Sequence, residues 1–208
     1  MKLHDIFPIA VAEFRIPIGI KSLREDLKMY KNIMKEHPLL DGGGFSTYDP
    51  SVSLLDKTEF RPLKKTFDTC LEEYKELIGL KDLQIVNSWF SVMTTNSSLK
   101  EHRHPASIVS GAYYPKCSIN SVGLTFKNPL EPYRMCELYN GVTGFNAVKG
   151  TLSVQEGHLY IFPSWLEHGT DVHTQEEERY VISFNTMHVD QSGHNKEWFA
   201  PQYNTKTI

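Results

Sequence analysis

The sequence predicts a single α+β domain, mainly β, in which helices near the N-terminus buttress one face of a sandwich or barrel of strands. Two amphipathic helical patterns fall in the first 82 residues, and the hydrophobic period then changes to that of short strands separated by turns. No internal repeat, low-complexity tract or linker divides the 208 residues. We therefore expect a helical buttress at 1–82, a strand core at 83–190 and a C-terminal tail at 191–208.

Composition excludes several classes of protein. Hydrophobic residues make up 40% of the chain and aromatic residues 12%, which is enough to build a core and too much for a disordered protein. The net charge of −3 offers no basic surface and argues against a nucleic-acid partner. No apolar run of about 18 residues, the length needed to span a membrane, and no signal peptide is present. We therefore expect a cytoplasmic protein that does not enter the membrane. Cys70, Cys117 and Cys136 are odd in number and widely spaced, which favours a reducing compartment.

The first helical pattern begins at Ser22, because Ser22-Leu-Arg-Glu25 has the form of a capping box. Pro38 ends this helix, since proline lacks the N–H that a helix needs, and a run of glycines at 42–44 then forms a flexible connection. Apolar residues repeat at helical spacing between these limits: Leu23, Leu27, Tyr30, Ile33 and Met34.

A second helix is expected from about residue 60 to residue 78, with Gly79 as its stop. Its charged residues fall on the face opposite the apolar stripe, so both helices are interpreted as scaffold. The stripe consists of Leu63, Phe67, Cys70, Leu71, Tyr74, Leu77 and Ile78.

The remaining chain reads as short strands that are rich in β-branched and aromatic residues. Turn signals such as Asn128-Pro and Asn140-Gly lie between them. The expected strands are 83–94, 107–114, 122–127, 134–139, 151–154, 158–162 and 179–187. Strands of this length and spacing are typical of a sandwich or barrel.

Three histidines form the main candidate site. Side chains alternate along a strand, so His102 and His104 project from the same side of an extended segment. His168 follows the strand that Gly157 opens and a turn at Pro163, and a barrel brings such distant strand ends together. A lone histidine is usually a solvated or hydrogen-bonded ring. Three neutral nitrogens in this pattern instead favour a divalent transition metal such as Fe, Co, Ni or Zn.

A metal with three protein ligands keeps open positions, where an ion such as Fe(II) can bind a bidentate organic acid and oxygen. The far carboxylate of such an acid needs a cation, and Arg179 opens a strand shortly after His168. Arg179, Ser183 and Asn185 share one face of that strand, so a hydroxyl could add to the two hydrogen bonds of the guanidinium. The alternative is an edge arginine that pairs with one of the glutamates at 176–178. The opposite face carries Tyr180, Ile182 and Phe184.

Four motifs carry a resemblance to a known family: His102-x-His104-Pro, Ser110-Gly-Ala-Tyr-Tyr114, Phe162-Pro-Ser-Trp-Leu-x-His168 and Arg179-x5-Asn185. In this order they resemble the 2-oxoglutarate/Fe(II)-dependent oxygenases, and within them a bacterial and phage branch with the pattern HxHP…SGxYY…FPSWLxH…R…FN. The similarity covers about residues 85–187. It implies a double-stranded β-helix, a jelly-roll or cupin-like core, with Fe(II) near one mouth, 2-oxoglutarate as cosubstrate and O2 as oxidant.

The resemblance also implies metal ligands. His102 and His168 correspond to the first and last iron ligands of the family, whereas His104 stands where the family has Asp or Glu. Three imidazoles leave iron with more net positive charge than two imidazoles and a carboxylate, which alters its redox properties. We favour His102, His104 and His168 as the catalytic metal site. Two alternatives stay open: a register that leaves Ala106 at a vacant second position, as in related halogenases, and Asp171 as an oxygen ligand.

The same resemblance matches Arg179 to the arginine that pairs with the C5 carboxylate of 2-oxoglutarate. Ser183, Tyr113 and Tyr114 are candidates to assist it in binding the cosubstrate. Tyr114 is an even number of residues from His102 and His104 and would face the same side of a continuous strand. Pro105 could break the alternation, so both tyrosines stay candidates.

The implied reaction is hydroxylation of an unidentified substrate with release of succinate and CO2. Asn87, Trp89 and Trp165 are candidates for the substrate side, although core packing and a satisfied strand amide explain them at least as well. A small molecule or a peptide is the expected substrate, and halogenation in place of hydroxylation stays open. A homodimer and a phage origin stay open too.

Two other functions fit the same residues. A metal cupin that works without 2-oxoglutarate, as a dioxygenase or an isomerase, shares the histidines, although Ile108 and Val109 stand where cupins have a glutamate. A jelly-roll that binds a ligand or builds a phage particle without catalysis is the second. Replacement of Arg179 separates the first from an oxygenase, because only an oxygenase needs this side chain for 2-oxoglutarate. Metal content separates the non-catalytic jelly-roll from both enzymes, because only the enzymes need a bound metal.

Overall fold

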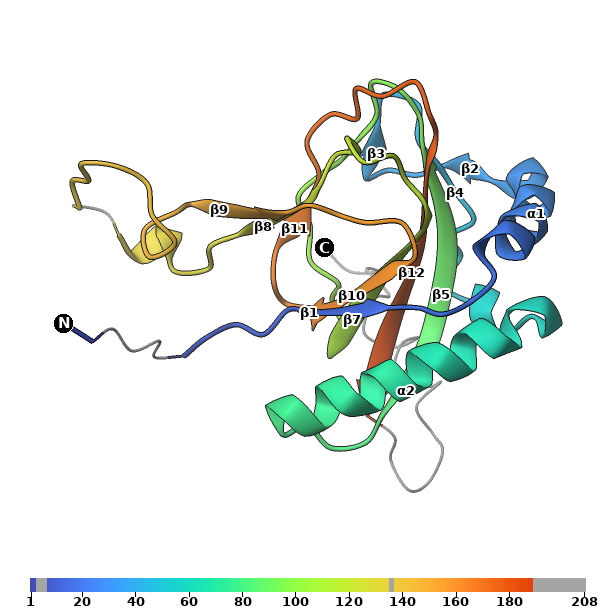
Figure 1. Cartoon of the computed structure of the whole chain (residues 1–208), viewed down its shortest axis with the longest axis horizontal. Helices are drawn as coiled ribbons and strands as arrows, with labels where there is room; N and C mark the ends of the chain where they lie inside the picture. The colour runs from blue at the N-terminus through green and yellow to red at the C-terminus, as the bar shows by residue number, and fades with distance from the viewer. Residues whose placement is uncertain (3–6, 135–136, 189–208) are drawn as a thin grey trace, which may run out of the picture.

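The strands form two main antiparallel sheets and a short additional pair (Figure 1). The structure is a computed structural model that describes residues 1–2, 7–134 and 137–188. The seven-stranded sheet has the order β1 (Ala12–Arg15), β10 (His158–Pro163), β7 (Val109–Lys116), β12 (Arg179–His188), β5 (Leu83–Met93), β4 (Phe45–Ser46) and β2 (Lys35–Glu36). The three-stranded sheet consists of β11 (His168–Gly169), β8 (Leu124–Lys127) and β9 (Lys149–Leu152), and the pair consists of β3 (Leu40–Asp41) and β6 (Ser98–Leu99).

A buried cluster joins the two main sheets. Tyr114 and Phe162 reach it from the larger sheet, and Leu124 and Phe126 reach it from the smaller one. Because each sheet buries one face in this cluster, the two sheets are the layers of a sandwich. The expected α+β, mainly β fold with two antiparallel layers is confirmed.

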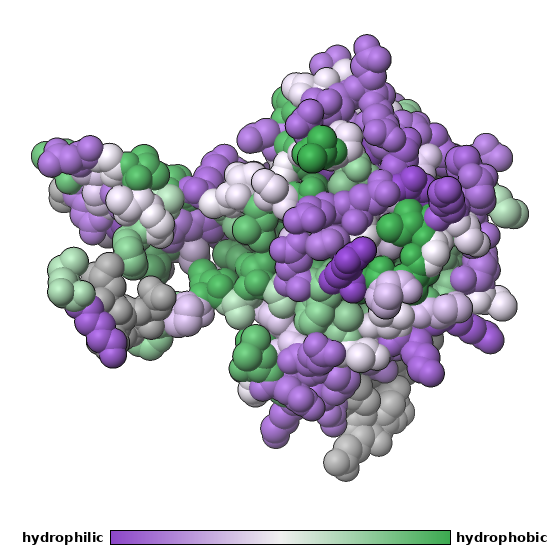
Figure 2. Space-filling model, viewed as in Figure 1, coloured by the Kyte–Doolittle hydropathy of each residue, from purple (hydrophilic) through white to green (hydrophobic). Residues whose placement is uncertain are grey.

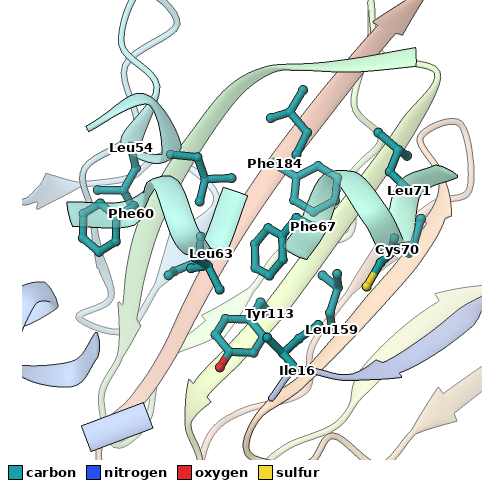
Figure 3. Packing of buried hydrophobic residues seen from close by; sticks show 14 of the residues in the cluster. Ile16, Leu54, Phe60, Leu63, Phe67, Cys70, Leu71, Tyr113, Leu159 and Phe184 are labelled. Carbon is teal, nitrogen blue, oxygen red and sulfur yellow. The ribbon is translucent and has the colours of Figure 1, made fainter. Parts of the chain in front are cut away.

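Helix α2 (Arg61–Ile78) covers the outer face of the larger sheet. Its side chains pack against Tyr113, Leu159 and Phe184, which project outward from three neighbouring strands (Figure 3). The helix ends at Gly79, whose φ of 71° is the left-handed conformation that a glycine adopts without strain. The second predicted helix and its stop are therefore confirmed. Its buried residues are Leu63, Phe67, Cys70, Leu71 and Tyr74.

The first helix is shorter than predicted and begins earlier. Helix α1 spans Ile20–Tyr30 and continues as a 3-10 turn, η1 (Lys31–Ile33). The N–H of Leu23 donates to the carbonyl of Gly19, and no side chain caps the helix. Ser22 is therefore inside the first turn, where it has no capping role. The chain then enters β2, which joins the edge of the larger sheet and ends the helical segment before the proline that was expected to stop it.

Six predicted strands are confirmed as β5, β7, β8, β9, β10 and β12, each within two residues of the expected bounds. The strand predicted at 134–139 is not, because residues 134 and 137–139 lie outside any strand and residues 135–136 lie outside the described chain. The strands that were not predicted are β1 and five pairs of residues, which are too short to show an alternating pattern. Three further 3-10 turns are η2 (Leu54–Asp56), η3 (Thr58–Phe60) and η4 (Glu131–Tyr133).

The segment from β8 to β9 projects from the sandwich as an arm (Figure 1). Hydrophobic residues are visible along the arm in Figure 2. Ion pairs of Lys149 with Glu101 and of Lys127 with Glu167 tie its base to the segments that carry two of the candidate histidines. Its exposed apolar side chains include Leu130, Tyr133, Leu138, Val142, Phe145 and Val148.

The structure bears on two expectations from the sequence, the state of the cysteines and the presence of membrane-spanning helices. Cys70 and Cys117 are buried and form no disulfide, whereas Cys136 and the C-terminal tail lie outside the described residues. Within the described ranges, no helix is long and apolar enough to cross a membrane.

Candidate active site

Three imidazoles meet where the two sheets come together. His102 and His168 face each other on an isolated antiparallel bridge, with backbone N–H···O distances of 2.9 and 3.0 Å. His104 follows two residues later, and its backbone N–H donates to the carbonyl of Ser164 (3.0 Å). One ring nitrogen from each histidine lies within 4.8 Å of the other two. The three nitrogens are close enough to share one ion.

Backbone carbonyls orient two of the rings. Nδ1 of His102 lies 2.8 Å from the carbonyl oxygen of Lys100, and Nδ1 of His168 lies 2.8 Å from that of Leu166. Because a carbonyl oxygen can only accept, Nδ1 carries the proton in both rings and Nε2 keeps its lone pair. Histidines that bind metals are commonly held in this way.

The three rings are held in the neutral form. Burial lowers the pKa of His104 to about 2 and that of His168 to about 4, and it also lowers the pKa of His102. The neighbouring imidazoles add to this effect in His104 and His168, because one positive ring disfavours another. Near neutral pH the lone pairs are therefore available to a metal ion, and the donor set fits a divalent transition metal.

Arg179 lies at the start of β12 and lines the same cavity, with only 1% of its surface exposed. Its Nη1 donates to the sulfur of Met93 (2.8 Å), and its guanidinium lies 4.6 Å from the centre of the Tyr114 ring. Nε and Nη2 have no hydrogen-bond partner in the described part of the chain. A buried cation with unpaired donors is costly unless an anion completes it, so this side chain fits a carboxylate ligand.

The acidic run before Arg179 does not neutralise it. Glu178 pairs with Lys31 (2.6 Å) and Glu177 with Lys116 (3.4 Å). Strand β12 lies between β7 and β5 in the sheet, so this arginine is not at an edge. The alternative of an edge arginine paired with the glutamates is wrong.

The two tyrosine candidates lie on opposite faces of β7. Tyr114 faces the cavity, and the guanidinium of Arg179 lies 4.6 Å from the centre of its ring. Tyr113 packs against α2 in the outer core, away from the cavity (Figure 3). Tyr113 is therefore not part of the site. Ser183 lines the cavity on the same face of β12 as Arg179, as the alternation predicts.

The cavity has a volume of about 1150 Å³ and holds two of the three candidates for the substrate side. Trp89 stacks on His104, with ring centres 5.8 Å apart, and Asn87 lines the wall with its buried Oδ1 unpartnered in the described chain. Trp165 does not line the cavity, and 53% of its surface is exposed. Tyr48, which was not predicted, also lines the cavity, and its ring meets Trp89 edge to face at 5.1 Å.

The two alternatives for the second ligand position find no geometric support. Asp171 is exposed and interacts with Lys149, outside the histidine cluster. Ala106 has a φ of 56° in the turn that leads into β7. The register that leaves it vacant would exclude His102 as a ligand, yet a ring nitrogen of His102 lies within 4.8 Å of those of His104 and His168. This turn follows Pro105 and breaks the alternation between the histidines and β7.

A chain of serine hydroxyls beside the histidines was not predicted. Ser107, Ser164 and Ser110 are joined in series by oxygen–oxygen distances of 2.7 Å, and Ser110 donates to Oδ1 of Asn185 (2.8 Å). Asn185 and His104 line the same cavity. Serines are too common for their spacing to signal such a network. The quoted motifs nevertheless contain Ser110, Ser164 and Asn185.

Comparison with known proteins agrees with the resemblance in the motifs. The family model described as "Putative 2OG-Fe(II) oxygenase" matches residues 87–185, which include β7, β10 and most of β5 and β12. No curated protein sequence matches the chain. The family match, taken with the solved structures below, confirms the resemblance. Over these residues the chain is similar to the 2-oxoglutarate/Fe(II)-dependent oxygenases.

Several solved structures share the fold at low sequence identity. HygX from Streptomyces hygroscopicus, solved with nickel and 2-oxoglutarate, is 12% identical with a TM-score of 0.62, covering 87% of this chain and 84% of its own. A prolyl-4-hydroxylase from Pseudomonas putida is 11% identical with a TM-score of 0.58, covering 88% and 94%. The viral collagen prolyl hydroxylase of Paramecium Bursaria Chlorella virus-1, in its 2-oxoglutarate complex, is 10% identical with a TM-score of 0.56, covering 86% and 96%. These likenesses confirm the jelly-roll core.

Proposed function

We propose that the protein is a 2-oxoglutarate/Fe(II)-dependent oxygenase that hydroxylates a small-molecule or peptide substrate in the cavity between the sheets, with succinate and CO2 as coproducts. The observation that carries this proposal is the buried Arg179, whose Nε and Nη2 lack partners in the described chain and line the cavity of the three histidines. A metal site alone does not need a buried cation. A dicarboxylate that reaches from the metal to a guanidinium does.

His102, His104 and His168 are the proposed metal ligands. Two of them donate Nδ1–H to backbone carbonyls and so present Nε2, and all three have a lowered pKa. O2 is the oxidant of the proposed reaction; Fe(II), when bound, would activate it, and 2-oxoglutarate would donate two electrons as it is converted to succinate and CO2. The protein holds the three rings in place and keeps them neutral.

Arg179 is the proposed partner of the far carboxylate of 2-oxoglutarate, through two parallel hydrogen bonds from its unpaired nitrogens. Tyr114 keeps the guanidinium in position from below, at 4.6 Å. Ser183 lies on the same face of β12 and can add a hydroxyl to the carboxylate. Because the strand is central in its sheet, this end of the site is rigid.

The substrate is proposed to bind beside the histidines, along the wall that Trp89, Tyr48 and Asn87 form. The cavity of about 1150 Å³ leaves room for a second organic molecule next to 2-oxoglutarate. HygX has been solved with hygromycin B bound, which supports a small-molecule substrate for this fold. The unpartnered Oδ1 of Asn87 offers a hydrogen-bond acceptor for orienting it.

Succinate formation from 2-oxoglutarate, with Fe(II) and air, tests the proposal. The unaltered protein should form succinate slowly without substrate and faster when a compound from a screen fits the cavity. The accepted compound should gain one oxygen atom by mass spectrometry. The variant Arg179→Met should bind metal normally and lose succinate formation. If the unaltered protein converts no 2-oxoglutarate under any of these conditions, the proposal is wrong.

A further inference from the structure

The arm between β8 and β9 carries a large apolar surface that the rest of the described chain leaves in water (Figure 2). Leu138 is 99% exposed, Val142 84% and Tyr133 82%. Further apolar side chains on the arm and on β9 are 39–60% exposed: Leu130, Tyr139, Phe145, Val148 and Leu152. Together these side chains expose on the order of 800 Å², whereas the largest apolar patch of a typical monomer measures about 300–600 Å².

Polar contacts at its tip and its base brace the arm in this exposed form. Asn146 closes the tip, because its Oδ1 accepts the N–H of Thr143 (2.6 Å) and its Nδ2 donates to the carbonyl of Gly141 (2.8 Å). At the base, the N–H of Asn128 donates to the carbonyl of Val148 (2.8 Å). The arm therefore has a defined shape of its own, while its apolar side chains stay in contact with water, which is unfavourable.

The arm leads directly into an open edge of a sheet. Strand β9 is the outermost strand of the three-stranded sheet, and no other strand of the described chain pairs with its second edge. All four of its residues are exposed. An open edge presents backbone N–H and C=O groups that can pair with another strand. A partner that pairs with β9 would therefore also lie against the apolar arm.

The edge of β9 is complementary to a second copy of itself. Two copies related by a two-fold axis pair their identical strands antiparallel. In the register centred between Gly150 and Thr151, Lys149 lies opposite the partner's Leu152, so the two lysines do not face each other. Each Lys149 is also paired with Glu101 of its own copy. An added Cβ at Gly150 would meet nothing within 4 Å, which leaves room for the partner's Thr151.

The size of the surface also fits a second copy. A stable interface of standard size buries about 800 Å² on each partner, which is the apolar area that the arm and β9 of each copy supply. The net charge of −3 is small, so repulsion between two copies is weak. A two-fold arrangement uses the same surface on both copies and leaves neither arm uncovered.

We propose that the arm and β9 form the interface of a homodimer. In this dimer β9 pairs antiparallel with the partner's β9, so the three-stranded sheets of the two copies join into one. The arms cover each other's apolar side chains. The interface involves no residue of the histidine cluster, so its test is made without metal or 2-oxoglutarate and stands apart from the proposed function.

Sedimentation equilibrium of the unaltered protein over a range of concentrations should give twice the mass of the chain. The double variant Tyr133→Glu, Phe145→Glu places two charges in the apolar interface and should raise the dissociation constant of the dimer by roughly 100-fold or more. The matched control is Met29→Glu, Leu77→Glu. Its two positions, on α1 and α2, are 75% and 76% exposed, and it makes the same change in charge. It should stay a dimer, and thermal unfolding checks the fold of both variants.

Hydrogen exchange tests the pairing of β9. The amides of β9 that do not pair with β8 should exchange at least about 10-fold more slowly in the unaltered protein than in the Tyr133→Glu, Phe145→Glu variant at equal concentration. Equal exchange in the two proteins overturns the pairing. An unaltered protein that sediments as a monomer at every concentration overturns the homodimer and leaves the arm to a different protein or to lipid. A dimer that persists in the arm variant places the interface elsewhere and overturns the inference as well.

Discussion

The two faces of β12 serve different purposes. The outward face carries Ile182 and Phe184, which are fully buried and pack in the apolar core beneath α2. The inward face carries Arg179, Ser183 and Asn185, which line the cavity and offer hydrogen-bonding groups. Because side chains alternate along the strand, one face packs in the core and the other lines the cavity. Substitutions on the outward face should change the free energy of unfolding, and those on the inward face should change ligand binding.

The largest effect is expected for Phe184→Ala on the outward face. The ring of Phe184 fills the space above Gly111, where an added Cβ would lie 2.3 Å from it, so its removal opens a cavity that the strand cannot close. The loss in free energy of unfolding should be about 3–5 kcal/mol by urea denaturation. The affinity of the remaining folded protein for 2-oxoglutarate should not change. A loss below 1 kcal/mol would show that this face is not the main core.

Arg179→Met changes the inward face of β12 and should weaken ligand binding without lowering the free energy of unfolding. Without the guanidinium, 2-oxoglutarate loses its buried ionic partner, which should weaken binding by about 2–5 kcal/mol, or roughly 30- to several-thousand-fold, by calorimetry. The ligand-free protein should be as stable as the unaltered protein or more stable, because an unpaired buried charge is removed. A marked loss of stability without ligand would mean that Arg179 has a structural role.

The histidines should make the metal-free protein sensitive to acid. An unfolded histidine has a pKa near 6.5, whereas burial holds the pKa of His168 at about 4 and that of His104 at about 2. Below pH 6.5 the unfolded chain therefore binds more protons, and stability should fall by about 1.4 kcal/mol per pH unit for each histidine down to the folded pKa.

Urea denaturation of the metal-free protein between pH 7.5 and 5 measures this slope, over a range where most carboxylates stay ionised. In the variant His104→Phe, the slope of the unfolding free energy against pH should be smaller by the contribution of one histidine. Equal slopes in the two proteins would contradict the neutral, buried state of that ring.

The smallest effects are expected from two matched changes on β7. Tyr113→Phe removes a buried hydroxyl that has no partner among the described residues, so stability should stay the same or rise by up to about 1 kcal/mol. Tyr114→Phe removes a hydroxyl that interacts with Arg179, so 2-oxoglutarate should bind roughly 5-fold more weakly, equivalent to about 1 kcal/mol. If Tyr113→Phe weakens 2-oxoglutarate binding more than Tyr114→Phe does, the assignment of the two faces is wrong.

Alternation along strands explains what could be predicted from the sequence. The faces of β12 are as expected because it is a long strand flanked by partners on both sides. The same logic could not choose between Tyr113 and Tyr114, because Pro105 and the left-handed Ala106 interrupt the strand before them. The short strands of the edges depend on tertiary pairing, and two residues carry no period.

The features of the site that depend on packing between distant segments could not be predicted from the sequence. The exposed Trp165 and the cavity-lining Trp89 look alike in the sequence, and only packing distinguishes them. Likewise, a serine network that joins three segments has no local signature. The histidine cluster itself was predictable, because three metal-binding side chains at strand ends are uncommon.

The central claim is that Arg179 and the three histidines bind one molecule of 2-oxoglutarate together with Fe(II). Anaerobic titration of the metal-free protein with both, followed by visible absorption, tests it most directly. We predict a charge-transfer band that requires both additions, that is lost in His168→Ala, and that needs much more 2-oxoglutarate in Arg179→Met. A protein that gives no band with both present, or an equal band in Arg179→Met at the same 2-oxoglutarate concentration, would contradict the account.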